Sequence, residues 1–149
     1  MKQAPRPVFC RIGSGNKHFR IINDNCRVSA THRLGDEGQG FILAMQGLDS
    51  GRIGIAAQSI GVARAALRAA IQLARQREQF GQPIARFQGL RWIMADMAME
   101  IEAAHQLTLS AAAMKDMEHN YTMQASMAKL FASEMVNRIR AKALQIHGG

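Results

Sequence analysis

The 149-residue chain has few cysteines, few prolines and few aromatic residues. Its two cysteines, Cys10 and Cys26, are too few for a disulfide framework or a CxxC metal site, so we expect a reducing compartment such as the cytoplasm. Three prolines and a 48% hydrophobic content rich in alanine and methionine favour long helices. The chain also has no run of 18 apolar residues, so we expect no membrane span.

Several sequence motifs that indicate a specific catalytic or binding function are missing as well. The chain contains no HExxH, no Walker loop, no GxGxxG and no local serine-nucleophile signature, and its five histidines are dispersed, so we expect no metal site. Its net charge of +8 raises nucleic acid as a partner, but the basic residues form no cluster. We therefore expect no nucleic-acid binding, which leaves a solvated surface or a protein that holds small phosphorylated molecules.

The periodicity of apolar residues predicts an all-α fold. Stripes at helical spacing predict three long helices, over residues 41–79, 84–117 and 122–146. The first stripe begins at Phe41, Met45 and Leu48, and we expect Gly54 and Gly61 to permit close helix–helix approach. Long helices with short links fold antiparallel, so the chain is predicted to be an up-down bundle of three helices, an incomplete four-helix bundle.

Residues 1–36 differ from this pattern. Short β-prone runs at 19–22 and 26–28, separated by a turn-like Asn-Asp-Asn, predict a β-like N-terminal arm. Two strands of this length are marginal alone. We therefore divide the chain into 1–36, a remnant of a β-domain with its linker, and 37–149, the helical bundle.

The link between the first two helices, residues 77–84, carries the strongest candidate for ligand binding. Gly81 is expected to end the first helix, and Pro83 to stand in the first turn of the next. This leaves Arg77 in a last helical turn, with Phe80 at the tip. The guanidinium suits a phosphate, but an arginine that merely satisfies the helix dipole is the more economical interpretation of an isolated RxxFG.

Two further groups have a structural and a functional interpretation. Asp49 and Arg52 share one helical face, as an intrahelical ion pair or as a polar pair at a ligand cleft. Gln145, Gly148 and Gly149 close the last helix, as a simple cap or as a backbone surface for a phosphate or ring.

Together these groups resemble the C-terminal part of the acyl-CoA dehydrogenase family, most closely its short-chain (butyryl) and branched short-chain members. The resemblance spans roughly residues 14–149, less than half of a usual member, and is carried by Gly40-Phe41, 48–58, 77–81 with Gln88, 125–129 and 145–149. It implies an FAD-dependent enzyme that oxidises an acyl-CoA thioester to enoyl-CoA. A carboxylate takes the α-proton, the β-hydride passes to FAD, and an electron-transferring flavoprotein accepts the electrons.

The resemblance also implies roles for particular residues. The cofactor-binding set would be Arg77 at the FAD pyrophosphate of a neighbouring subunit, with Gln79, Phe80, Gln88, Gln145, Gly148 and Gly149. The substrate-binding set would be Asp49, Arg52 and Phe41. The family implies a homo-oligomer, a dimer or tetramer, in a bacterial cytoplasm or a mitochondrial matrix.

One family feature is not found. The base is expected beyond Gly149, and at its alternative position the chain has Gly51, which has no side chain. We therefore expect no catalytic residue in this chain and no activity from it alone. The competing hypotheses are a non-enzymatic helical oligomerisation module derived from this family, and a basic nucleic-acid-binding bundle, which the scattered charges disfavour.

Overall fold

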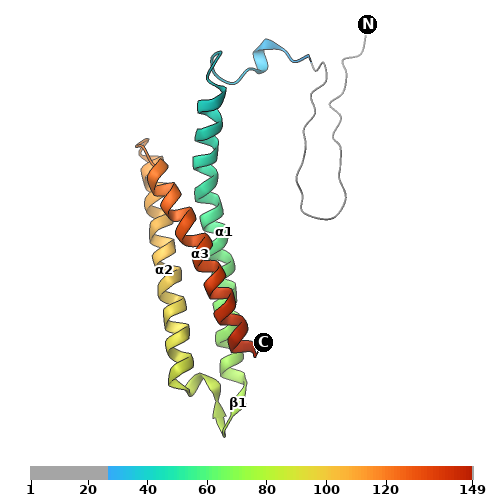
Figure 1. Ribbon diagram of the computed structural model, residues 1–149, viewed down its shortest axis with the longest axis vertical. Coiled ribbons are helices and arrows are strands. Elements are labelled where there is room, and N and C mark those ends of the chain that lie inside the picture. Colours follow the sequence, from blue (N-terminus) through green and yellow to red (C-terminus); the bar gives the residue numbers. More distant parts are fainter. Residues whose placement is uncertain (1–26, 149) are drawn as a thin grey trace. The chain divides into compact units, whose positions relative to one another are not determined.

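The computed structural model describes residues 27–148, in which three long helices form the bundle (Figure 1). The chain divides into two units at Phe41, and only residues from Ile42 onward contain the packed helices. The elements in order are the 3₁₀ turn η1 (Ala30–His32), α1 (Gly40–Gln76), β1 (Glu78–Gln79), β2 (Gln82–Pro83), the 3₁₀ turn η2 (Ile84–Arg86), α2 (Gln88–Asp116) and α3 (Thr122–His147).

The predicted all-α bundle is confirmed, while the N-terminal arm is largely outside the described residues. The predicted strand at 19–22 and Cys26 of the second run lie outside them, and Arg27 and Val28 have no regular structure. In the first unit, Ser29 caps η1 by accepting from the Thr31 backbone N–H, and Arg33 Nη1 lies 2.9 Å from a Glu37 carboxylate oxygen. Both contacts are exposed and local.

Alanine lines much of the core and lets α2 and α3 approach closely. The fully buried alanines include Ala104 and Ala111 of α2 and Ala128 and Ala132 of α3. A methyl group needs little space, so the two backbones pack with short side chains between them. Larger side chains fill the rest of the core, of which the biggest fully buried ones are Met97, Met135 and Ile139.

Helix α1 completes the core with a stripe that begins later than predicted. Its buried residues are Ala56, Ile60, Ala63, Ala70 and Ala74, whereas Phe41, Met45 and Leu48 are exposed. The expected close approach at the two glycines is also wrong within residues 27–148. A Cβ placed on Gly54 or Gly61 would meet no atom within 4 Å.

The link between α1 and α2 is a β-hairpin, which corrects the prediction of a simple helix break. Helix α1 ends at Gln76, three residues early, and β1 pairs antiparallel with β2 in the register Glu78↔Pro83 and Gln79↔Gln82. Phe80 and Gly81 form the two-residue loop with φ values of 54° and 75°. Two positive φ values are the signature of a type I′ turn, so Gly81 serves the hairpin rather than the helix end. Pro83 precedes η2, so α2 begins only at Gln88.

An ionic cluster joins α2 to α3 near the middle of the bundle. Glu100 of α2 accepts from Arg138 and Lys142 of α3, at 2.8 and 3.0 Å, and its side chain is only 16% exposed. Burial alone would raise the pKa of Glu100. The hydrogen bonds and positive charges of Lys142 and Arg138 outweigh burial and lower the pKa below its ordinary 4.5.

The lowered pKa of Glu100 predicts a pH-dependent contribution to stability. The contribution is fully present above pH 4.5, the unfolded value, and is lost as the pH falls through the lower folded value. We expect Glu100→Gln to reduce the free energy of unfolding by about 1–3 kcal/mol at pH 7, and by much less near pH 3. Urea unfolding at both pH values measures this. Glu134→Gln, at an exposed carboxylate without an ion-pair partner among the residues described, is the control. An equal loss at both pH values would contradict the assignment.

Candidate functional site

A polar network ties the first part of α1 to the start of α3. Arg52 Nη1 donates to Asp49 Oδ1 within α1 and, at 3.1 Å, to Ser126 Oγ of α3. Thr122 Oγ1 donates to Asp49 Oδ2 at 2.7 Å. Both carboxylate oxygens of Asp49 are therefore occupied, one from its own helix and one from α3. The sequence predicted the Asp49–Arg52 pair, and the structure adds the hydroxyl groups that hold it.

The surrounding hydroxyls are fixed in turn. Ser126 Oγ donates to the Thr122 backbone carbonyl at 2.7 Å, and Tyr121 Oη lies 3.0 Å from Ser50 Oγ. The contacts of Thr122, Ser126 and Tyr121 with α1 join residues more than 70 positions apart, so sequence reasoning did not assign these three residues a role. The sequence signal for these contacts was the pair of hydroxyl residues Thr122 and Ser126, four positions apart at the start of a predicted helix.

A second cluster lies at the far ends of α1 and α3. Arg77 directly follows α1, and its N–H still donates to the Leu73 carbonyl at 2.8 Å. Its Nη1 reaches the His147 carbonyl at 3.5 Å and would lie 3.3 Å from a Cβ on Gly148. The structure thus brings together two groups that the sequence singled out separately, Arg77 and the end of α3. Glycine at 148 leaves the room that the guanidinium occupies.

Gly148 itself acts as the cap of α3. With φ of 95° its N–H donates to the carbonyls of Leu144 and Gln145, at 3.2 and 3.1 Å. The structural interpretation of this glycine is therefore correct, and its N–H is already used. Gln145 is exposed in the last turn of α3, and Gly149 lies outside the described residues.

The other predicted cofactor residues belong to the hairpin and the start of α2. Gln79 pairs with Gln82 in the hairpin, and Gln88 is the first, exposed residue of α2. Phe80 is 93% exposed, although its ring contacts Phe87 edge to face at a centroid distance of 6.2 Å. An almost fully exposed phenylalanine at a rigid turn presents an apolar surface to a ligand or a neighbouring molecule.

The two clusters stand far apart because Asp49 and Arg52 lie in the first half of α1, whereas Arg77 directly follows its end. Twenty-five residues separate Arg52 from Arg77, which is about 37 Å of helix axis. Helix α3 runs parallel to α1 over the same distance, since the start of α3 contacts Asp49 and its end contacts Arg77. Phe41, the remaining predicted substrate residue, is exposed at the beginning of α1, and its unit is not placed relative to these clusters.

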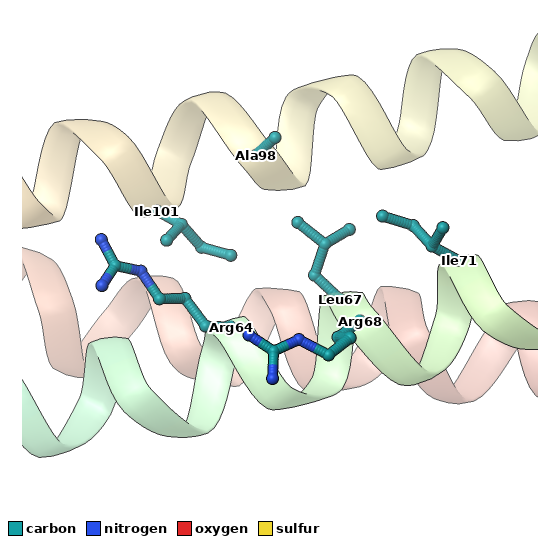
Figure 2. A pocket seen from close by; sticks show the side chains of 6 residues that line it. All are labelled: Arg64, Leu67, Arg68, Ile71, Ala98 and Ile101. Atoms are coloured by element: carbon teal, nitrogen blue, oxygen red, sulfur yellow. The ribbon is translucent and has the colours of Figure 1, made fainter.

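An apolar groove of about 350 Å³ lies between α1 and α2, away from both clusters (Figure 2). Leu67 and Ile71 of α1 line it together with Ala98 and Ile101 of α2, and Arg64 and Arg68 border it. None of the predicted site residues lines this groove. Only the two arginines bring polar groups to it, so it has little means of orienting a small ligand.

The described residues contain neither a helix that could span a membrane nor a cluster that could hold a metal ion. Among residues 27–148, no helix is both long enough and apolar enough to cross a membrane. In the same part of the chain, no three histidine, cysteine or acidic side chains gather as a metal ion would require.

The helices α1, α2 and α3, with polar contacts from both ends of α3 to α1 and Arg77, form a helical bundle domain. Residues 38–149 match the C-terminal domain of acyl-CoA dehydrogenases, and the chain belongs to this family. The resemblance that the motifs indicated is therefore confirmed.

Relatives of this chain include bacterial and mitochondrial proteins. The caffeyl-CoA reductase–Etf complex subunit CarC of Acetobacterium woodii is 51% identical over 129 residues, or 87% of this chain and 34% of CarC. The short-chain acyl-CoA dehydrogenase of Megasphaera elsdenii is 44% identical over 88% of this chain and 34% of its own length. The chain thus spans about a third of the relatives it matches.

A solved structure shares the fold. Butyryl-CoA dehydrogenase from Megasphaera elsdenii superposes with a TM-score of 0.83 at 44% sequence identity, covering 87% of this chain and 34% of that one. The bundle of α1, α2 and α3 is therefore an established architecture of the family's C-terminal domain.

Proposed function

We propose that this chain is the C-terminal bundle of an FAD-dependent acyl-CoA dehydrogenase, and that it supplies contacts to FAD and to acyl-CoA within a homo-oligomer. The observation that carries the proposal is the pair of polar clusters at opposite ends of α1 and α3. Each cluster contains an arginine that keeps guanidinium N–H groups without an acceptor among residues 27–148, and each coincides with a motif of the family.

The residues around Arg77 fit a diphosphate. Nη1 makes one long contact, of 3.5 Å, to the His147 carbonyl, and the remaining guanidinium donors have no partner among residues 27–148. Arg77 is exposed, and its guanidinium fits against Gly148, where a side chain would crowd it. Arg77 would hold the FAD diphosphate, with Gln79, Phe80, Gln88, Gln145, Gly148 and Gly149 around the dinucleotide. Bound FAD would supply the electron acceptor that amino-acid side chains lack.

The Asp49–Arg52 cluster would contact the acyl-CoA, with Phe41 bordering its chain. Asp49 would orient Arg52 rather than act as the base, since it pairs with Arg52 and accepts from Thr122. Gly51 at the alternative position has no side chain. The chain therefore contributes binding, and the base comes from elsewhere in the assembly.

The clusters lie about 37 Å apart along α1, which supports placing Arg77 and Arg52 of one copy at different sites of a homo-oligomer. Exposed apolar side chains support assembly, among them Trp92 and Met99 on α2 and Met123, Leu130 and Leu144 on α3. The same surfaces would support the alternative, a module that only oligomerises.

The electron acceptor would be an electron-transferring flavoprotein. The printed name of CarC places that relative in a complex with Etf, which supports the same kind of partner here. A bacterial cytoplasm or a mitochondrial matrix would be the compartment, in keeping with bacterial and mitochondrial relatives.

Sedimentation velocity of this chain with and without FAD tests the proposal. If FAD lies between copies, adding it at a hundredfold excess over its dissociation constant stabilises the assembly by about 2.7 kcal/mol. We expect dimers or tetramers to form at lower protein concentrations with FAD, while riboflavin, which lacks the diphosphate, has no such effect. Assembly that is the same with and without FAD would favour the module that only oligomerises. A monomer in all conditions would contradict both that module and the FAD-binding bundle.

A further inference from the structure

The hydrogen bonds of Arg52 divide its guanidinium into a used and an unused side. Nη1 carries two hydrogens, and the structure gives both of them an acceptor, Asp49 Oδ1 and Ser126 Oγ. The three remaining N–H groups, on Nε and Nη2, have no acceptor among residues 27–148. The Arg52 side chain is 37% exposed, so solvent reaches part of it.

The direction of each hydrogen bond follows from its neighbours. Ser126 gives its own proton to the Thr122 carbonyl, so its oxygen can only accept from Arg52. Asp49 accepts from Thr122 on its second oxygen and cannot turn away from Arg52 without losing that bond. Both N–H groups of Arg52 Nη1, and the Asp49 and Ser126 oxygens that accept from them, are therefore fixed in these hydrogen bonds.

We propose that Ser126 and Thr122 are positioning residues. Ser126 holds Arg52 directly and Thr122 holds it through Asp49, so that the Nε–Nη2 edge of Arg52 faces the acyl-CoA. This proposal rests on the proposed function and adds to it the residues of α3 that orient the substrate contact. Two parallel N–H groups on one edge suit a pair of acceptor oxygens, as on a phosphate, or a single carbonyl oxygen. The CoA thioester offers both in its phosphates and its amide and thioester carbonyls.

Fixing the guanidinium in advance improves binding because less rotational freedom is lost when the ligand arrives. A free arginine on a helix surface samples many rotamers, whereas Arg52 is held from its own helix and from α3. The network also docks the beginning of α1 against α3, so one set of contacts fixes both the arginine and the helix that carries it.

The test compares the affinity of butyryl-CoA for the FAD-loaded assembly across hydroxyl variants. We expect Ser126→Ala to weaken binding about 3- to 10-fold, the effect of one hydrogen bond, and Ser126→Thr to retain it. Ser133→Ala is the matched control, because Ser133 lies on the same helix and its hydroxyl donates only to the Leu130 carbonyl. S-butyryl-pantetheine, which lacks the phosphates, identifies the group that Arg52 contacts. If Ser126→Ala weakens its binding as much as that of butyryl-CoA, Arg52 contacts a carbonyl. If only butyryl-CoA binding is weakened, Arg52 contacts a phosphate.

Two further measurements separate positioning from mere loss of stability. Ser126 makes no contact with Arg77, which would hold the FAD diphosphate, so FAD affinity should stay unchanged in Ser126→Ala, whereas unfolding would lower both affinities. Side-chain nitrogen NMR should show restricted rotation of the Arg52 guanidinium in the wild type and freer rotation in Ser126→Ala. Equal butyryl-CoA affinity in wild type and Ser126→Ala would overturn the positioning role alone. Failure of the wild type to bind butyryl-CoA, with FAD bound normally, would overturn the proposed substrate and the positioning role that rests on it.

Discussion

Replacing Arg77 by alanine should weaken FAD binding to this chain by about ten- to hundredfold, with the helical content unchanged. A charge-assisted hydrogen bond contributes about 1.5–3 kcal/mol, which corresponds to this range of affinity. Arg77 lies just beyond α1 and is exposed, so the truncation creates no cavity in the core. Titration of the apo-protein with FAD, followed by flavin fluorescence, measures the loss directly.

Lysine at the same position distinguishes a phosphate contact from a helix-end charge. Arg77→Lys keeps the positive charge but not the planar fork, so we expect it to rescue FAD affinity only in part. An arginine that merely satisfies the helix dipole would be replaced by lysine almost without effect.

Arg75→Ala is the control, since Arg75 is also exposed at the end of α1 and makes no ion pair among the described residues. Equal FAD affinity for wild type, Arg77→Ala and Arg77→Lys would reject the phosphate role of Arg77.

The sequence was sufficient to predict the helices because their pattern is local. Ile60, Ala63 and Ala70 recur at helical spacing, and each is buried as a helical stripe requires. The hairpin was missed because its turn places a phenylalanine at positive φ, where residues with a Cβ are strained, so the sequence lacks the usual Asn-Gly signal. The strands are also only two residues long, too short to show an alternating pattern.

The candidate site was predictable only in part, for a different reason. Asp49 and Arg52 are three residues apart, so their pairing follows from helix geometry. Their partners Thr122 and Ser126 come from a helix more than 70 residues later, and one sequence does not reveal such contacts. The approach of Arg77 to Gly148 likewise depends on α1 and α3 running in parallel with ends that coincide. The exposure of Met45 and Leu48 shows that an apolar stripe identifies a helical face but not what covers it.

The stability of the bundle should depend most strongly on the few large side chains among its alanines. Met135 of α3 is fully buried, and Met135→Ala is expected to lower the free energy of unfolding by about 2–5 kcal/mol. This is a large part of the 5–15 kcal/mol typical of a domain. The surrounding alanines have no side-chain length with which to fill the space, so the cavity persists. Thermal and urea unfolding, followed by circular dichroism, measure the loss.

Two variants isolate the cavity as the cause. Met135→Leu keeps most of the volume and should cost less than about 1.5 kcal/mol. Met123→Ala makes the same chemical change on the same helix, at a side chain that is 62% exposed, and should alter stability by about 0.5 kcal/mol or less when copies are dissociated. Similar losses at positions 135 and 123 would mean that Met135 is not enclosed as described. A large loss at position 135 alone would establish that the enclosed packing of Met135 is a main source of the bundle's stability.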